Sequence, residues 1–315
     1  MDKPLTAPGK SFSWINVTTL ASGMDLRLPV HRISGAQPGP VLGITASIHG
    51  DEYLPIEVVR QVVTQLDPAQ LRGTVLAMPV ANPLAFEAQT RNVPIDMLNL
   101  NRVFPGDPDG WLTEQLAAVI ANQFVPQLEY LIDLHAGGAQ PTVDYVYILN
   151  DEGMSRAFGF AALYRPTHRF EGTLSEAALP RGIHNMVVEM GGGMLADEPY
   201  IKRGVRGVFN VLKYFKMLPG EPEGIPAEQT VVTEMSVIRP HFGGLLYPRL
   251  MLKDVGTIVP QGTLLGMVVN PYTFETLEEF RAPFERSLMI LLRGAITKVH
   301  PGDYAYMLGN AAGAS

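Results

Sequence analysis

The order of apolar segments in the N-terminal and central parts of the chain is the feature that most narrows its fold. Strand-length apolar runs at 25–33, 41–48 and 74–78 alternate with amphipathic helical patterns at 54–66 and 111–125. The run 41–48 is almost entirely apolar, as in a strand that is covered on both faces of a sheet. Strands that alternate with helices in this way predict an α/β fold, with a mostly parallel or mixed sheet flanked by helices.

The same pattern continues further along the chain. We expect strands at 130–134, 143–149 and 185–189, a helix at 154–163, and a longer helix capped by Asp197 that runs to about residue 217. A Pro- and Gly-rich stretch then begins at Leu218, and beyond it short apolar runs are separated by Gly and Pro, with one helical pattern at 275–280. Such a change in composition is typical of a linker between domains.

We therefore expect an α/β domain at 1–218 and a small β-rich domain at 230–315.

The charge balance excludes some partners. The net charge is −7, so nucleic acid is not an expected partner, because its phosphates are bound by clustered Lys and Arg. No window approaches the roughly 18 consecutive apolar residues of a membrane span, and residues 1–10 lack the apolar core of a secretion signal. We expect a soluble, cytoplasmic protein with no membrane partner.

The chain contains no cysteine. This excludes a thiol nucleophile, a disulfide and any thiolate-bound metal or iron–sulfur cluster. If the chain binds a transition metal, the ligands must come from histidine and carboxylate side chains.

A polar cluster follows the buried run 41–48. His49-Gly-Asp-Glu52 places an imidazole and a carboxylate three residues apart at the carboxyl end of a strand, which is where open α/β sheets form their sites. Gly50 allows a tight turn, so both side chains can bind one metal ion. A second pair with the same spacing, His168 and Glu171, follows no strand and is interpreted as an ordinary polar loop.

Two further strand ends carry polar residues. His135 ends the run at 130–134, and Asp133, on the same strand face, either supports that imidazole or caps a turn. Glu189 ends the run at 185–189, immediately before a series of glycines. Two histidines and one glutamate with an open position are typical of a hydrolytic zinc site, and a further glutamate then suits the role of general base.

The segment 82–106 contains two positively charged side chains. Arg91 lies in Thr-Arg-Asn, and Asn101 and Arg102 lie in Leu-Asn-Arg-Val-Phe-Pro. A guanidinium group presents a planar fork that suits a carboxylate, and an adjacent amide adds donors. Taken singly, arginines of this kind are most often members of surface ion pairs. Tyr145 and Tyr147 are interpreted as packing residues of their strand.

Taken in order, these motifs resemble one known family. They are His-Gly-Asp-Glu at 49–52, Asn-Pro at 82–83 followed by Arg91, Leu-Asn-Arg-Val-Phe-Pro-Gly at 100–106, Asp-Leu-His at 133–135 and Val-Glu-Met-Gly-Gly at 188–192. The set resembles the succinylglutamate desuccinylase/aspartoacylase family, a branch of the zinc carboxypeptidase-like hydrolases. The segment 254–266 also resembles a turn sequence in the small β domain of that family.

The resemblance implies one zinc ion per chain, with three ligands: His49, Glu52 and His135. It implies that Glu189 is the catalytic glutamate, which deprotonates the attacking water and later protonates the leaving amine. Arg91 would help to stabilise the oxyanion. Asn101 and Arg102 would hold the α-carboxylate of the substrate. The domain at 1–218 would then be the zinc-dependent catalytic domain.

The family cleaves N-acyl amino acids into a carboxylic acid and an amino acid. We therefore expect a zinc-dependent amidohydrolase, a deacylase that acts on the linear, non-peptide amide bond of a small carboxylate-bearing substrate. N-acetylaspartate is not expected, because no arginine in 165–181 aligns with the one that aspartoacylase uses for its second carboxylate.

Two alternatives remain. One is a zinc carboxypeptidase that acts on peptide C-termini. The other is an inactive, metal-bound protein that binds a small ligand, suggested by Asn99 where the family usually has Asp. The acyl group, the amino acid, the acylated nitrogen, the metal in vivo and a homo-oligomeric state stay open.

Overall fold

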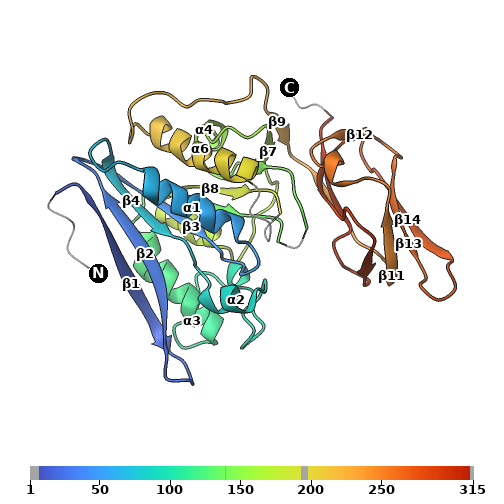
Figure 1. The fold of residues 1–315 in the computed structure, drawn as a ribbon, viewed down its shortest axis with the longest axis horizontal. Helices are drawn as coiled ribbons and strands as arrows, with labels where there is room; N and C mark the ends of the chain where they lie inside the picture. Colours follow the sequence, from blue (N-terminus) through green and yellow to red (C-terminus); the bar gives the residue numbers. More distant parts are fainter. Residues whose placement is uncertain (1–6, 139, 193–197, 313–315) are drawn as a thin grey trace.

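The computed structural model describes residues 7–138, 140–192 and 198–312. Helices cover both faces of a large sheet, and a group of C-terminal strands lies to one side of it (Figure 1). The large sheet has nine strands in the order β1 (Gly9–Thr19), β2 (Asp25–Ser34), β4 (Arg72–Met78), β3 (Gln37–Ala46), β5 (Tyr130–His135), β8 (His184–Glu189), β6 (Tyr145–Tyr147), β7 (Ala162–Tyr164) and β9 (Thr230–Val232).

Parallel pairing dominates the centre of this sheet. Strands β4, β3, β5 and β8 are parallel neighbours. The pairs β1–β2, β2–β4 and β6–β8 are antiparallel. The predicted mixed sheet flanked by helices is confirmed. The sequence reading did not include β1.

The helices that cover the sheet are α1 (Leu54–Gln65), α2 (Pro83–Ala88), α3 (Leu112–Val119), α4 (Glu152–Ala157), α5 (Leu174–Ala178) and α6 (Glu198–Tyr214). A π-helical turn at Ile120–Phe124 and a 3-10 turn at Val125–Gln127 follow α3. Further 3-10 turns lie at Leu100–Arg102, Leu179–Arg181 and Leu252–Asp254. The predicted cap Asp197 of α6 lies outside the described residues.

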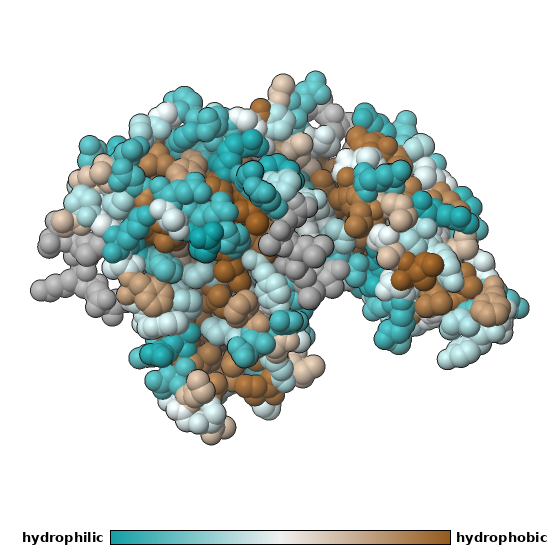
Figure 2. Space-filling view, viewed as in Figure 1, coloured by the Kyte–Doolittle hydropathy of each residue, from teal (hydrophilic) through white to brown (hydrophobic). Residues whose placement is uncertain are grey.

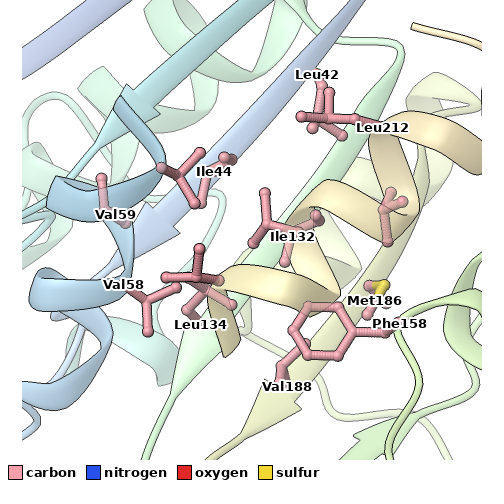
Figure 3. Packing of buried hydrophobic residues seen from close by; sticks show 14 of the residues in the cluster. Leu42, Ile44, Val58, Val59, Ile132, Leu134, Phe158, Met186, Val188 and Leu212 are labelled. Carbon is pink, nitrogen blue, oxygen red and sulfur yellow. The ribbon is translucent and has the colours of Figure 1, made fainter. Parts of the chain in front are cut away.

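Strand β5 shows how the sheet divides the core. Ile132 and Leu134 belong to the cluster under α1 and α6, whereas Leu131 belongs to the cluster under α3 and α5. This alternation follows from the two-residue period of a strand, and it buries apolar side chains on both faces. Figure 3 shows the first cluster, with Ile132 and Leu134 beside Val58 of α1 and Leu212 of α6. A strand in this position carries side chains toward solvent only at its ends.

The C-terminal strands form two antiparallel four-stranded sheets. One has the order β10 (Met235–Ile238), β17 (Tyr306–Asn310), β15 (Arg286–Leu292) and β12 (Ile258–Pro260). The other has the order β14 (Thr276–Arg281), β13 (Leu264–Val269), β11 (Gly244–Pro248) and β16 (Thr297–Val299). The division into domains at 1–218 and 230–315 stays a proposal. No helix in the described segments is long and apolar enough to cross a membrane.

One predicted helix is wrong in its second half, and another is wrong throughout. In the segment 154–163 the helix α4 ends at Ala157, and Ala162–Tyr164 is strand β7, which pairs with β6 and β9. The segment 275–280 lies in strand β14, which pairs with β13. In both cases backbone pairing in a sheet outweighs a helical pattern that extends over few residues.

The first prediction concerns the core. Ile132→Ala removes a fully buried side chain of the central sheet and should lower the free energy of unfolding by about 2–5 kcal/mol, because it removes apolar burial and leaves a cavity. Ile225→Ala, at a position that is 39% exposed, should cost at most about 0.5 kcal/mol. Urea denaturation measures both. Equal losses would show that the sheet centre is not the stabilising core.

Candidate functional site

The site lies at the carboxyl ends of three neighbouring parallel strands. Ala46 of β3 pairs with Leu134 of β5, and His135 of β5 pairs with Glu189 of β8. The chain leaves β3 through Ser47, which has a positive φ of 53°, and His49 follows in the turn. His135 and Glu189 are therefore direct neighbours, and the turn after β3 lies on the other side of His135.

Gly50 is required by the close approach of a second segment. A Cβ atom at this position would lie 1.9 Å from the backbone carbon of Ala85 in α2, so any other residue would force the two segments apart. The Gly50 amide also donates to the carbonyl of Thr90, at 2.9 Å. These contacts fix the turn that carries His49 against the loop that carries Arg91.

A His–Glu–His group forms the centre of the site. Glu52 Oε1 lies 2.7 Å from Nδ1 of His49, and Glu52 Oε2 lies 3.0 Å from Nδ1 of His135. All three residues are buried, and each offers one ligand atom within 4.8 Å of the other two. The structure thus brings together the three residues that the sequence predicted as metal ligands.

The contacts of His49 fit a metal ligand better than a simple hydrogen-bonded imidazole. Its Nδ1 lies 3.2 Å from Nη1 of Arg91 as well as 2.7 Å from Glu52. A guanidinium only donates and needs a lone pair on Nδ1, whereas an ionised carboxylate only accepts and needs a proton there. One nitrogen cannot meet both demands. A divalent cation accepts lone pairs from nitrogen and oxygen alike, so this donor set suits a metal.

Asp133 supports the second imidazole. Its Oδ2 lies 3.0 Å from Nε2 of His135, and its Oδ1 accepts a hydrogen bond of 2.7 Å from the Thr45 hydroxyl. A carboxylate at Nε2 holds a proton on that nitrogen, so Nδ1, which faces Glu52, is the nitrogen that can bind a metal, the arrangement usual for metal-binding histidines. Of the two roles that the sequence left open for Asp133, the structure supports this one.

These contacts shift the pKa values of two members of the His–Glu–His group. Burial acts to lower the pKa of His135, but the carboxylates of Asp133 and Glu52 outweigh it and raise that pKa well above its usual value. Burial acts to raise the pKa of Glu52, but the two imidazoles hold it far below its usual range. Glu52 is therefore ionised, as a metal ligand must be.

The pKa of Glu189 is shifted in the opposite direction from that of Glu52. Burial raises its pKa to about 8, an effect that the negative charge of Glu52 strengthens and that His135 and Arg91 oppose. A carboxyl group whose pKa lies near neutrality can both take up and release a proton. A divalent cation at the neighbouring group would favour the ionised form and lower this pKa.

The turn at Asn99–Arg102 is held by its own hydrogen bonds. Asn99 Oδ1 accepts from the Asn101 amide at 2.9 Å, and Asn101 Oδ1 accepts from the Leu174 amide at 3.0 Å. An amide oxygen at position 99 can accept the same bond as a carboxylate, so Asn99 keeps the turn intact. The hydrogen bond from Leu174 also fixes the orientation of the Asn101 side-chain amide, since its oxygen must face that backbone N–H.

The two arginines lie near one another. Arg91 Nη1 lies 3.6 Å from Glu52 Oε1. Burial lowers the pKa of Arg102, and the positive charge of Arg91 adds to this effect. Two guanidinium groups close enough to repel each other favour binding of an anion between them.

Three tyrosines lie near this site. The sequence predicted Tyr145 and Tyr147 as packing residues, which their hydrophobic cluster confirms, and it did not single out Tyr304. Tyr145 pairs with Glu189 across the β6–β8 ladder, and its hydroxyl lies 3.3 Å from that of Tyr147. Electrostatic interactions also link Tyr304, which precedes β17, to Arg102 and Tyr147. The available signal was the Tyr-Val-Tyr spacing, which puts both hydroxyls of β6 on one strand face. Nothing local in the sequence pointed to Tyr304.

Comparison with known proteins identifies the family. The succinylglutamate desuccinylase/aspartoacylase catalytic domain matches residues 38–215, more than half of the chain. The chain belongs to the succinylglutamate desuccinylase/aspartoacylase family, as its motifs predicted. Members of this family are hydrolases that act on amide bonds, so this chain is a hydrolase.

Individual relatives agree with this assignment. The chain is 29% identical over 283 residues to the N-alpha-acetyl-L-2,4-diaminobutyric acid deacetylase of Halomonas elongata, with 84% of this chain and 80% of the relative covered. The product-bound structure of the ectoine utilization protein EutE (DoeB) from Ruegeria pomeroyi has a TM-score of 0.86 at 25% identity, covering 98% and 97% of the two chains.

A third relative supports the fold alone. The succinylglutamate desuccinylase/aspartoacylase structure from Rhodobacter sphaeroides has a TM-score of 0.87 at 22% identity, covering 99% of this chain and 98% of that chain. The likeness extends over the C-terminal sheets as well as the large sheet.

The second prediction concerns Asp133. Asp133→Asn should weaken zinc affinity about 10–100-fold, because a neutral amide no longer fixes the tautomer of His135. Competition with a chromogenic chelator measures the affinity. Asp151→Asn is the matched control, since Asp151 contacts His184 at 2.8 Å and belongs to no part of the His–Glu–His group. If both variants bind zinc equally well, Asp133 does not support the metal ligand.

Proposed function

We propose that this chain is a zinc-dependent deacylase that hydrolyses the amide bond of an N-acyl amino acid. The observation that carries the proposal is the pairing of His135 with Glu189 on adjacent parallel strands. This pairing puts a carboxyl group with a pKa of about 8 next to a buried His–Glu–His group. One zinc ion per chain and a cytoplasmic location are parts of the proposal.

Each residue has a separate task in this mechanism. Zinc held by His49, Glu52 and His135 would supply Lewis acidity to the amide carbonyl and acidify the attacking water. Glu189 takes a proton from that water and returns it to the leaving nitrogen. Arg91 donates to the carbonyl oxygen as negative charge develops on it.

The turn at 101–102 binds the other end of the substrate. The guanidinium of Arg102 and the NH₂ group of Asn101 donate to the α-carboxylate. Binding at a group that does not react fixes the amide bond relative to Glu189, which lowers the entropic part of the barrier. The Halomonas relative is named for an N-acetylated amino acid, which supports a small acyl group and an amino acid as the two halves of the substrate.

The third prediction separates chemistry from metal binding. Glu189→Gln should retain zinc and lower kcat by about 10²–10⁴-fold, because the amide cannot accept the proton. Glu198→Gln, at an exposed position on α6 that pairs with Lys202, should leave kcat unchanged. Amine release from a panel of N-acyl amino acids measures turnover, and metal analysis measures zinc. Near-normal turnover in Glu189→Gln would refute the mechanism.

The fourth prediction concerns the ligand set and the reaction class. His49→Ala should lose zinc and all metal-dependent activity, because two of the expected ligands remain in place of three. The wild-type protein should hydrolyse N-acetyl amino acids and leave tripeptides intact. Cleavage of tripeptides without cleavage of any N-acyl amino acid would identify a carboxypeptidase instead.

A further inference from the structure

Tyr147 is held rigidly at the edge of the site. Its ring makes T-shaped contacts with Tyr164, at a centroid distance of 5.2 Å, and with Phe170, at 5.7 Å. A third ring, that of Tyr145, lies 5.4 Å away. Aromatic contacts on several sides fix the ring plane. The direction of the hydroxyl bond to the ring is thereby fixed as well.

The neighbouring tyrosine determines which way the hydroxyl proton of Tyr147 points. The two hydroxyl oxygens are 3.3 Å apart, so one group donates to the other. Tyr145 is only 2% exposed and packs in an apolar cluster with Leu288 and Ile290. The hydrogen bond acts to raise the pKa of Tyr145 and to lower that of Tyr147, as expected when Tyr145 donates and Tyr147 accepts. Tyr145 therefore donates, and the proton of Tyr147 remains free for another acceptor.

Both hydroxyls keep their protons at neutral pH. Burial raises the pKa of Tyr145 and of Tyr147 well above the usual value, and the negative charge of Glu189 adds to the effect in each case. A protonated hydroxyl whose oxygen already accepts one bond acts as a donor toward any anion that enters the site.

The ring of Tyr147 is also fixed relative to Arg102. Phe170, which packs against Tyr147, lies two residues before Gly172. The carbonyl of Gly172 accepts from the Phe104 amide at 2.9 Å. Gly172 has a φ of 75°, and a Cβ there would lie 2.2 Å from the carbonyl oxygen of Arg102. The segment that holds Tyr147 is thus docked on the turn that carries Arg102, and the two side chains interact electrostatically.

We propose that Tyr147 is a substrate-binding residue whose hydroxyl donates to the same substrate carboxylate that Arg102 binds, with Tyr145 orienting the hydroxyl. This inference rests on the proposed function, since it takes an N-acyl amino acid as the ligand. A carboxylate has about four acceptor positions, and a guanidinium fork occupies two of them. Donors from Asn101 and Tyr147 complete the set.

The test compares two substrates and two variants. Tyr147→Phe should raise KM for an N-acetyl amino acid about 10-fold or more, the loss expected for a hydrogen bond to a charged group. Its kcat should stay within about twofold of wild type, because the chemical step does not use this hydroxyl. On the matching N-acetyl amine, which lacks the carboxylate, Tyr147→Phe and wild type should have equal kcat/KM.

Two further variants serve as references. Tyr130→Phe removes a hydroxyl from a ring that stacks on Phe215 with a centroid distance of 3.6 Å, and it should match wild type on both substrates. Tyr145→Phe should raise KM less than Tyr147→Phe, because Tyr147 keeps its proton and loses only the group that orients it. Zinc content and circular dichroism confirm that each variant is folded.

The outcomes separate the inference from the proposed function. A lower kcat at unchanged KM in Tyr147→Phe would mean that the hydroxyl acts on Glu189, and unchanged kinetics would mean that it has no role; either result overturns the inference. If the wild-type protein hydrolyses no N-acyl amino acid, the proposed function fails. Calorimetry then compares binding of the N-acetyl amino acid by the wild-type protein and by Tyr147→Phe. Weaker binding by Tyr147→Phe supports the inference. Equal binding by the two proteins, or no binding by either, overturns it.

Discussion

The parallel backbone pairing of β5 with β8 is the constraint on which the site depends. It places His135 beside Glu189, and the pairing of β3 with β5 places the turn with His49 and Glu52 on the other side. Because side chains alternate along a strand, a shift of one residue in either ladder would turn a required group into the apolar core. Ile132 and Leu134 on one face and Leu131 on the other oppose such a shift, since each fits only its own cluster.

A chain of buried polar contacts joins this backbone frame to the proposed chemistry. It runs from the Thr45 hydroxyl through Asp133 and His135 to Glu52 and His49. Charged groups without partners are very costly in a protein interior, whereas groups that satisfy one another are tolerated. The same strands that form the hydrophobic core thus also orient the imidazoles. This explains how so polar a cluster can lie next to apolar layers.

Much of the fold and of the site could be predicted from the sequence, for identifiable reasons. The run 41–48 is nearly all apolar, and His49, His135 and Glu189 each come at or just after the end of such a run, so local patterns sufficed to place them together. Strand β1 was missed because Ile15 is its one buried residue, so it lacks a clear apolar pattern. Strands β7 and β14 were taken for helix because they have three and six residues, too few to separate the period of a strand from that of a helix. The proximity of Tyr147 and Tyr304 to Arg102 could not be predicted, since it depends on tertiary contacts that no local pattern encodes.

The C-terminal sheets are joined to the large sheet by backbone contacts near the site. The Val143 amide donates to the carbonyl of Ile290 at 2.8 Å, and Thr142 forms a bridge with Leu291. Both contacts lie just before β6, whose tyrosines face Glu189, whereas the His–Glu–His group draws no residue from this region. Amino-acid changes in the C-terminal sheets can therefore reshape the surroundings of β6 while the His–Glu–His group stays as it is. In a chain built this way, the neighbourhood of the site and its buried His–Glu–His centre can change independently of each other.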